Sequence, residues 1–205
     1  MFQLHTPDTT RGKIPILLLA AGPSSRMGRS KQLLPVHGKP LLQTIVNELV
    51  AAGTGEVIVV LGAYAKDHKK TISSHRIKTI ENGQWQNGMG SSIKVGLNFI
   101  QEQVARPEAI IISVCDQPHL ASGHIIALAH LYRTSKKTIV ASTYNGAIGV
   151  PVLFDKSHFA SLAKINDNEG AKNIIQQNLA QTATLPFPLG GMDLDTMQDY
   201  NRFIQ

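Results

Sequence analysis

Short apolar runs and helically spaced apolar residues alternate along the first half of this 205-residue chain. The continuous runs are typical of strands that are buried on both faces of a sheet. They predict strands at residues 16–19, 56–61 and 109–114, and a shorter strand is expected at 77–80. Apolar residues at three- and four-residue spacing predict helices at 41–50 and 90–103, and a helix with a polar face is expected at 63–72. Because the order of strand, loop and helix recurs, the sequence predicts a parallel sheet with helices on both faces.

The second half of the chain is less regular. It predicts helices at 121–132, 157–163 and 171–179, strands at 138–143, 150–154 and 183–185, and a last helix that opens at Asp195 and Thr196. Pro151 has no amide to donate, so the strand 150–154 is expected to be an edge strand or to contain a bulge. We predict an α/β protein with a single three-layer, Rossmann-like domain over residues 14–205, preceded by a flexible polar arm at residues 1–13.

The composition narrows the classes of function. No apolar run approaches the roughly 20 residues that a membrane-spanning helix needs, so we expect no membrane partner. The single cysteine, Cys115, cannot form an internal disulfide and fits a buried thiol in a reducing, cytoplasmic compartment. The net charge of +6 is dispersed and only 5% of residues are aromatic, which favours an anionic small molecule over nucleic acid. The eight histidines show no metal-binding spacing.

The segment 16–31 carries the strongest chemical pattern, because an apolar strand leads there into a loop of small residues. Residues 20–22 are Ala-Ala-Gly, so their backbone amides can approach a ligand closely. Arg26, Arg29 and Lys31 then bring three cations together within six residues. The glycine spacing fits neither a P-loop nor a dinucleotide-binding fingerprint. The pattern favours a phosphate-binding loop over the alternative, a solvated basic turn.

Two further segments follow predicted strands and are expected at the same edge of the sheet. Residues 82–92 are rich in glycine and hydroxyl groups just before a helix, where amides and the helix dipole suit an anion or a base edge. A surface loop held by Trp85 is the alternative for this segment. Asp116 comes just after the apolar run 109–114, in a place that suits a hard cation such as Mg²⁺. A capping or turn aspartate is the alternative there.

These motifs carry a resemblance to a known family. The pattern Leu19-Ala20-Ala21-Gly22-x-Ser24-x-Arg26-Met27-Gly28-x-x-Lys31 resembles the signature of the MobA-like nucleotidyltransferases, and is most similar to molybdenum cofactor cytidylyltransferases. Similar family motifs stand at 82–92, at Cys-Asp-Gln-Pro (115–118) and at Met-Asp-Leu-Asp-Thr (192–196). The resemblance implies transfer of a nucleoside monophosphate, with CTP as the expected donor, to the phosphate of molybdopterin cofactor. Pyrophosphate would be released, and the product would serve a xanthine-dehydrogenase-type enzyme.

The resemblance also implies roles for individual residues. It places phosphate-binding and catalytic roles on Arg26, Lys31 and Asp116. Its nucleotide-binding residues would be Leu19, Ala20, Ala21, Gly22, Ser24, Arg26, Gly28, Lys31, Gly62, Gln86, Gly88 and Met89. Its acceptor-binding residues would be Ser91, Ser92, Gly149 and Pro151. Mg²⁺ would be held by Asp116 and by Asp195, or by Asp193 in place of Asp195, although Asp195 could instead be only the N-cap of the last helix. Without ligand, the Lys31 side chain is expected to face solvent.

One segment departs from the family pattern. Relatives often show Gly-Asp-x-Gly-Ala where this chain has Asp-Asn-Glu-Gly-Ala at residues 167–171, so an amide replaces a carboxylate. This leaves the acceptor open. Two alternatives therefore stand beside the cytidylyltransferase hypothesis. One is a related transferase with another nucleotide or phosphate acceptor, and the other is a non-catalytic chaperone that carries the cofactor to a molybdenum hydroxylase apoenzyme.

Overall fold

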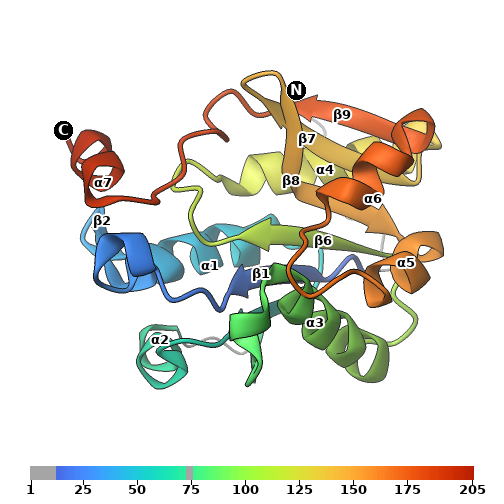
Figure 1. The fold of residues 1–205 in the computed structure, drawn as a ribbon. Coiled ribbons are helices and arrows are strands. Elements are labelled where there is room, and N and C mark those ends of the chain that lie inside the picture. Colours follow the sequence, from blue (N-terminus) through green and yellow to red (C-terminus); the bar gives the residue numbers. More distant parts are fainter. Residues whose placement is uncertain (1–12, 73–75) are drawn as a thin grey trace, which may run out of the picture.

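A seven-stranded sheet forms the centre of the computed structural model, which describes residues 13–72 and 76–205 (Figure 1). The strands are β1 (Ile16–Ala20), β4 (Val57–Leu61), β5 (Ile77–Glu81), β6 (Ala109–Val114), β7 (Ile139–Tyr144), β8 (Ala147–Asp155) and β9 (Thr182–Pro186). Their order is β5-β4-β1-β6-β8-β7-β9, and β8 alone runs antiparallel to its neighbours. The predicted, mostly parallel α/β sheet is confirmed.

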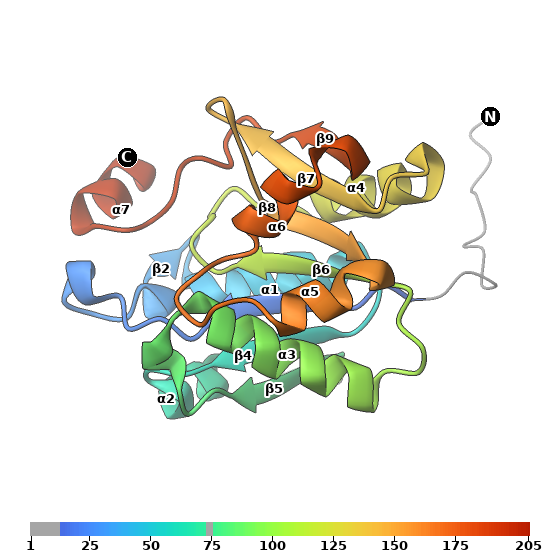
Figure 2. The ribbon, with the colours of Figure 1, turned by 45° about the vertical axis from the view of Figure 1, so that its right-hand side comes forward.

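Two apolar layers lie on opposite faces of this sheet, because successive side chains of a strand point to opposite sides. In β1, Ile16 and Leu18 belong to one layer, and Leu17 and Leu19 to the other. The first layer is covered by α1 (Leu41–Ala52) and α4 (Ser122–Ser135). The second is covered by α3 (Met89–Gln103), α5 (Phe159–Ala163) and α6 (Lys172–Gln177), which lie in front of the sheet in Figure 2. This is the predicted three-layer domain.

Most predicted elements are confirmed to within a few residues. Helix α1 ends at Gly53, which adopts the left-handed conformation that a glycine stop requires (φ 66°). The predicted polar helix after β4 is α2 (Ala65–Thr71), and the last helix is α7 (Met197–Phe203). Short 3-10 turns are η1 (Ser25–Met27), η2 (Lys31–Leu33), η3 (Trp85–Asn87), η4 (Lys156–His158) and η5 (Leu179–Gln181). The predicted arm at residues 1–13 lies outside the described residues, apart from Lys13.

Of the two alternatives expected around Pro151, an edge strand or a bulged strand, the structure shows the bulge. Strand β8 lies inside the sheet, between β6 and β7. Its pairing with β7 shifts so that Ala141 faces Val152 while Ser142 faces Gly149. The ladder thereby skips Pro151, and the Ser142 hydroxyl donates to the Pro151 carbonyl at 2.6 Å. An interior strand can therefore contain this proline, because the missing amide is not required by the ladder.

Connections at one end of the sheet hold the candidate site. Between β1 and α1 lie η1, η2 and a small hairpin of β2 (Pro35–Val36) and β3 (Lys39–Pro40). Helix α7 lies beside this hairpin (Figure 1), where the Tyr200 hydroxyl donates to the Pro35 carbonyl at 2.7 Å. The Leu194 amide donates to the Asp116 carbonyl at 2.9 Å, which brings the segment before α7 next to the end of β6. Among the described residues, no helix combines the length and apolar character needed to cross a membrane.

Candidate active site

A cleft with a volume of about 540 Å³ opens at the carboxyl ends of β1 and β6. Its walls come from the loop after β1, the turn before α3, the end of β6 and Asp195. The lining residues are Leu19, Ala20, Ala21, Gly22, Pro23, Arg26, Lys31, Gln32, Trp85, Gln86, Gly88, Met89, Ser92, Val114, Cys115, Asp116 and Asp195. Parallel α/β sheets bind ligands at this edge, and small-molecule sites have comparable volumes.

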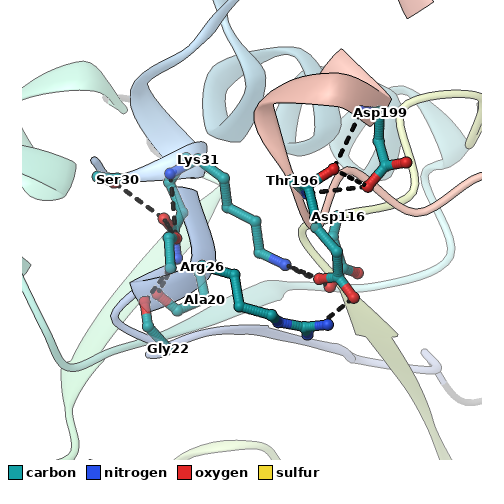
Figure 3. A network of polar contacts seen from close by, with 11 residues as sticks. Ala20, Gly22, Arg26, Ser30, Lys31, Asp116, Thr196 and Asp199 are labelled. Atoms are coloured by element: carbon teal, nitrogen blue, oxygen red, sulfur yellow. Dashed lines mark hydrogen bonds and ion pairs between the residues drawn. The ribbon is translucent and has the colours of Figure 1, made fainter. Parts of the chain in front are cut away.

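Four charged side chains form a connected network inside this cleft (Figure 3). The Lys31 ammonium donates to Asp116 Oδ2 at 2.8 Å and to Asp195 Oδ1 at 3.0 Å. The Arg26 guanidinium donates to Asp195 Oδ2 at 2.9 Å. Arg26 and Lys31 therefore meet on Asp195, although about 165 residues separate them from it along the chain (169 and 164).

The Lys31 side chain is only 14% exposed, so the expectation that it would face solvent is wrong. The two carboxylates hold its ammonium group inside the cleft. Burial lowers the pKa of Lys31, but the charges and hydrogen bonds of Asp116 and Asp195 outweigh that effect and raise it above its usual value. Lys31 therefore carries a full positive charge at neutral pH. Arg26 differs, because 70% of its side chain is exposed.

Asp195 is not the N-cap of α7. That position belongs to Thr196, whose hydroxyl accepts the Asp199 amide at 3.2 Å, while the Asp199 carboxylate accepts the Thr196 amide at 2.9 Å. This reciprocal capping box satisfies the first turn of the helix without Asp195. The Asp195 carboxylate is left to face the cleft, where both of its oxygens bind cationic side chains.

The two aspartates in the cleft fit a divalent cation. Asp116 Oδ2 and Asp195 Oδ1 converge on one ammonium group, at 2.8 and 3.0 Å, so their oxygens already surround a position that a cation can occupy. Carboxylate oxygens are the ligands that Mg²⁺ and similar hard cations prefer. Within residues 13–72 and 76–205, no group of three histidine, cysteine or carboxylate side chains is arranged to hold a metal alone. The remaining ligands would have to be substrate oxygens and water.

Asp193 adds negative charge beside this pair. Burial, together with the carboxylates of Asp116 and Asp195, raises the pKa of Asp193 to about 6. Its ordinary value is 3.8, so the carboxylates at this end of the sheet repel one another despite Lys31. A bound divalent cation would relieve this repulsion.

Comparison with known proteins identifies the type of domain. The family model described as the MobA-like NTP transferase domain matches residues 16–183. The chain belongs to this family. The match includes the phosphate loop, the turn before α3 and Asp116, whereas Asp195 lies beyond it. The predicted family resemblance is therefore confirmed, and with it a nucleotidyltransferase-like function.

Two curated relatives of this MobA-like domain match it along nearly their whole length. The purine catabolism protein PucB of Bacillus subtilis (strain 168) is 28% identical over 200 residues, which cover 90% of this chain and 93% of PucB. Nicotine blue oxidoreductase of Paenarthrobacter nicotinovorans is 26% identical over 208 residues, which cover 96% of this chain and 99% of the relative.

A solved structure shows the same fold. Rv0371c from Mycobacterium tuberculosis H37Rv superposes with a TM-score of 0.78 at 24% identity, over 93% of this chain and 96% of that protein. Rv0371C has also been crystallised in complex with manganese, and that structure superposes with a TM-score of 0.74 at 23% identity, over 93% of this chain and 97% of that protein.

The structure brings most of the nucleotide-binding residues predicted for the MobA-like domain together around the cleft. Leu19, Ala20, Ala21, Gly22, Arg26, Lys31, Gln86, Gly88 and Met89 all line it. Ser24, Gly28 and Gly62 do not. Gly62 supports the wall from behind, because a Cβ there would lie 2.7 Å from both the Ala21 carbonyl oxygen and Trp85 Cβ. Gly28 adopts a left-handed conformation (φ 66°) that ends the η1 turn.

The predicted acceptor-binding residues do not form one surface with the cleft. Ser92 lines it, but the Asn82 side-chain amide donates to the hydroxyls of both Ser91 (2.8 Å) and Ser92 (3.0 Å). The Ser91 hydroxyl itself donates to the Gly88 carbonyl at 2.7 Å, so it shapes the turn before α3. Gly149 and Pro151 lie in β8, outside the cleft lining.

The segment that departs from the family pattern packs against the same turn. The Gly90 amide donates to the Asp167 carbonyl at 2.8 Å, and the Asp167 carboxylate pairs with Lys94 and accepts from the Asn87 side chain. A Cβ at Gly88 would lie 2.7 Å from the Asn168 Cα atom. In this structure the segment therefore supports the wall that carries Gly88 and Met89.

Gln32 is a cleft residue that the sequence pattern did not indicate. It is 1% exposed, and its side-chain amide donates to the carbonyls of Ala20 (3.3 Å) and Gly22 (3.0 Å), which fixes the curvature of the loop. A glutamine that binds backbone carbonyls leaves no periodicity or motif by which sequence alone could find it. Pro23, Trp85, Val114 and Cys115 complete the lining that the predicted set lacks. The buried, unpaired thiol predicted for Cys115 is confirmed.

Proposed function

We propose that this protein transfers CMP from CTP to the phosphate of molybdopterin cofactor and releases pyrophosphate, for the maturation of a xanthine-dehydrogenase-type enzyme. The observation that carries the proposal is the meeting of Arg26, Lys31, Asp116 and Asp195 in one cleft beside a small-residue loop. Cations for phosphate oxygens and convergent carboxylates for a divalent cation are the two needs of phosphoryl-type transfer.

The nucleotide would lie along the loop after β1. The Ala20 and Gly22 carbonyls are bound by Gln32, and the Ala21 carbonyl accepts the Ala63 amide at 3.0 Å, so these oxygens are turned into the protein. Because a trans peptide unit directs its amide opposite to its carbonyl, the Gly22 amide points away from Ala63. Small side chains at 20–22 leave room for a base and ribose to approach this backbone.

The triphosphate would bind at the cationic side of the cleft. Arg26 is mostly exposed and can turn from Asp195 to a phosphate, whereas Lys31 is held in the interior of the cleft. Both cations would stabilise charge that moves onto the leaving pyrophosphate. An oxygen of the acceptor phosphate forms the new bond to the α-phosphorus as the bond to the bridging oxygen breaks, and pyrophosphate leaves with that electron pair. No enzyme nucleophile is required.

Mg²⁺ is the proposed metal, held by Asp116 and Asp195. When bound, it would neutralise phosphate charge and hold the α-phosphate in line for attack. The residues fit this role because their oxygens converge on one cation, Lys31. The manganese complex of Rv0371C supports a divalent cation in a protein of this fold.

The relatives support the choice of acceptor. One is described as a purine catabolism protein and the other as an oxidoreductase, two settings that suit a hydroxylase carrying a molybdenum cofactor. The Ala-Ala-Gly sequence at residues 20–22 supports CTP as the donor, since it resembles the cytidylyltransferase form of the signature. The apoenzyme of such a hydroxylase is the proposed protein partner.

A screen of four nucleoside triphosphates, each with and without molybdopterin cofactor, tests this function. We expect pyrophosphate release with CTP, Mg²⁺ and the cofactor together, and a cytosine dinucleotide form of the cofactor by mass spectrometry. Release with another triphosphate or another phosphate acceptor would assign the related transferase activity. Stoichiometric binding of the cofactor without pyrophosphate release would assign the non-catalytic chaperone. The Asp116→Asn variant serves as the matched inactive control.

A further inference from the structure

His68 is a fully buried, titratable residue for which the proposed reaction has no direct use. It lies on α2 with 0% of its surface exposed, and it does not line the cleft. Its Nε2 atom lies 2.7 Å from the Ser30 hydroxyl, which belongs to the phosphate loop. Burying polar groups costs free energy unless their hydrogen bonds are satisfied. This buried contact between a helix and the phosphate loop therefore suggests a specific role.

The neighbouring hydrogen bonds determine which atom carries the proton. The Ser30 hydroxyl donates to Gln32 Oε1 at 2.9 Å, so its only proton is already used. It must therefore accept from His68, which requires an imidazole ring protonated at Nε2. His68 Nδ1 is buried and has no hydrogen-bond partner among the described residues, which is consistent with an unprotonated nitrogen at that position. Burial lowers the pKa of His68, and this keeps the ring neutral at pH 7.

Gln32 connects Ser30 by hydrogen bonds to Ser24 and to the backbone at Ala20 and Gly22. Its oxygen accepts from the hydroxyls of Ser30 (2.9 Å) and Ser24 (3.1 Å), and its nitrogen donates to the Ala20 and Gly22 carbonyls. All four hydrogen-bonding positions of this amide are thereby satisfied. The Ser24 hydroxyl in turn accepts the Lys31 amide at 3.0 Å. The network therefore fixes the position of the Lys31 backbone relative to the end of β1.

We propose that His68 is a positioning residue that holds the phosphate loop, through Ser30 and Gln32, in the shape that binds the triphosphate. The inference rests on the proposed nucleotide-binding function of the cleft. His68 touches no substrate in this assignment. Ser30, Gln32 and His68 are almost without solvent exposure (9%, 1% and 0%). Water therefore cannot replace the hydrogen bond from His68 to Ser30 without local rearrangement.

Four variants test the proposal: His68→Leu, His68→Gln, Ser30→Ala and the double variant His68→Leu/Ser30→Ala. CTP affinity is measured by calorimetry, and KM and kcat by pyrophosphate release. Loss of the hydrogen bond between His68 and Ser30 is expected to weaken CTP binding about tenfold in His68→Leu, with a smaller change in kcat at saturating CTP. Ser30→Ala also loses the hydrogen bond to Gln32 and should weaken CTP binding at least as much. His68→Gln should regain most of the affinity, because its amide nitrogen can donate near the position of Nε2.

The double variant should be no weaker than Ser30→Ala, since that single variant already removes the contact with His68 together with the hydrogen bond from Ser30 to Gln32. A general loss of stability would not produce this pattern of rescue and non-additivity in affinity. His130→Leu, on the exposed side of α4, is the control and should leave CTP affinity unchanged. If His68→Leu fails to fold, Ser30→Ala decides the question.

The outcomes separate this inference from the function on which it rests. A wild-type protein that neither binds CTP nor releases pyrophosphate from any triphosphate would contradict the proposed function itself. A wild-type protein that binds CTP while Ser30→Ala keeps the same KM would overturn the role of His68. The role would also be overturned if His68→Gln were as weak as His68→Leu, because the donated proton would then not be what matters.

Discussion

The ammonium nitrogen of Lys31 lies 2.8 Å from the Asp116 carboxylate. In the proposed reaction, the same carboxylate would bind the metal ion. Asp195 completes the arrangement at 3.0 Å from the same nitrogen. Lys31 and a divalent cation bound in the cleft would therefore compete for the same two carboxylates. When substrate and metal bind, we expect the Lys31 ammonium to move to the phosphate oxygens, which would couple the binding of the two.

Replacing Lys31 by methionine should affect catalysis and metal binding in opposite directions. Loss of a preorganised charge should cost about 2 to 4 kcal/mol of transition-state stabilisation, measured as kcat/KM. Without nucleotide, the variant should bind Mn²⁺ more tightly than the wild type, because the competing ammonium is gone. Calorimetry with Mn²⁺ alone measures the second effect. Lys66→Met, at an exposed position on α2, is the control, and equal Mn²⁺ affinity in wild type and Lys31→Met would contradict the competition.

Asp116→Asn should remove most activity with little change in the thermal midpoint. The amide is a poor metal ligand, and a loss of at least about 100-fold in kcat is expected. Stability should hold because Lys31 keeps its pair with Asp195, and because the repulsion between Asp116 and Asp193 disappears. Turnover and thermal denaturation of the same preparation measure both effects. Asp67→Asn, which removes an exposed ion pair on α2, should leave kcat unchanged. Full activity of Asp116→Asn at ordinary Mg²⁺ would remove Asp116 from the metal site.

Asp195 and Thr196 are adjacent but should give separable defects. Asp195→Asn should lower activity and raise the Mg²⁺ concentration needed for half-maximal rate, because the metal loses a ligand. Thr196→Val removes the cap of α7 and should cost roughly 1 kcal/mol of stability without changing the Mg²⁺ dependence. Metal titrations of the rate and urea denaturation of both variants distinguish the two roles. An unchanged Mg²⁺ requirement in Asp195→Asn would mean that Asp195 serves only Lys31 and Arg26.

The sequence predicted elements well where a local pattern determines them. The strand 109–114 has the same limits in the structure, because a short segment rich in β-branched apolar residues favours a strand with both faces buried. The loop after β1 was also located, since small residues and cations stand together in the chain, and its residues line the cleft. Two neighbouring residues, Asp195 and Thr196, could both cap the last helix, and sequence alone left this open. Reciprocal hydrogen bonds with Asp199 give the cap to Thr196.

Contacts between distant segments could not be predicted in this way. Lys31 was expected to face solvent, because its partners lie 85 and 164 residues further along the chain. Gln32 was missed since it binds backbone carbonyls, which every residue carries. The sequence could not decide between an edge strand and a bulged interior strand for β8 for a similar reason. The pairing with β7 shifts and skips Pro151, so the sheet does not need the missing amide, and this shift depends on a neighbouring strand.

Ala21→Gly should relax the choice of base. The Ala21 methyl group lines the cleft and narrows it. The backbone there is held in place, because the Ala21 carbonyl accepts the Ala63 amide. Removing the methyl adds space and backbone freedom, and should lower the CTP to GTP ratio of kcat/KM by roughly tenfold. The ratio is measured by pyrophosphate release with each nucleotide. Ala109→Gly, at the far end of β6, is the control, and an unaltered ratio in Ala21→Gly would place base selection elsewhere, with Gln86 to Met89 as the next candidates.

Buried histidines should make the protein less stable as the pH falls below about 6.5. Burial lowers the pKa of His68 and of His158, so the folded protein resists protonation at pH values where the unfolded chain accepts it. The unfolded state then binds more protons, and linkage requires the free energy of unfolding to fall with pH in this window. For each proton that the unfolded state binds and the folded state does not, the free energy of unfolding changes by at most about 1.4 kcal/mol per pH unit.

Asp193 acts in the opposite direction, because its raised pKa of about 6 means that the folded protein takes up a proton before the unfolded chain does. The total pH profile therefore mixes two effects, and only the difference between wild type and His68→Gln isolates the histidine. That difference in unfolding free energy, from urea denaturation at pH 5 to 8, should be constant above about pH 7.5. Below about pH 6.5 the wild type should lose stability relative to the variant, because glutamine does not titrate. A difference that stays constant down to pH 5 would mean that His68 has the same proton affinity in both states, which is incompatible with a neutral imidazole held by Ser30.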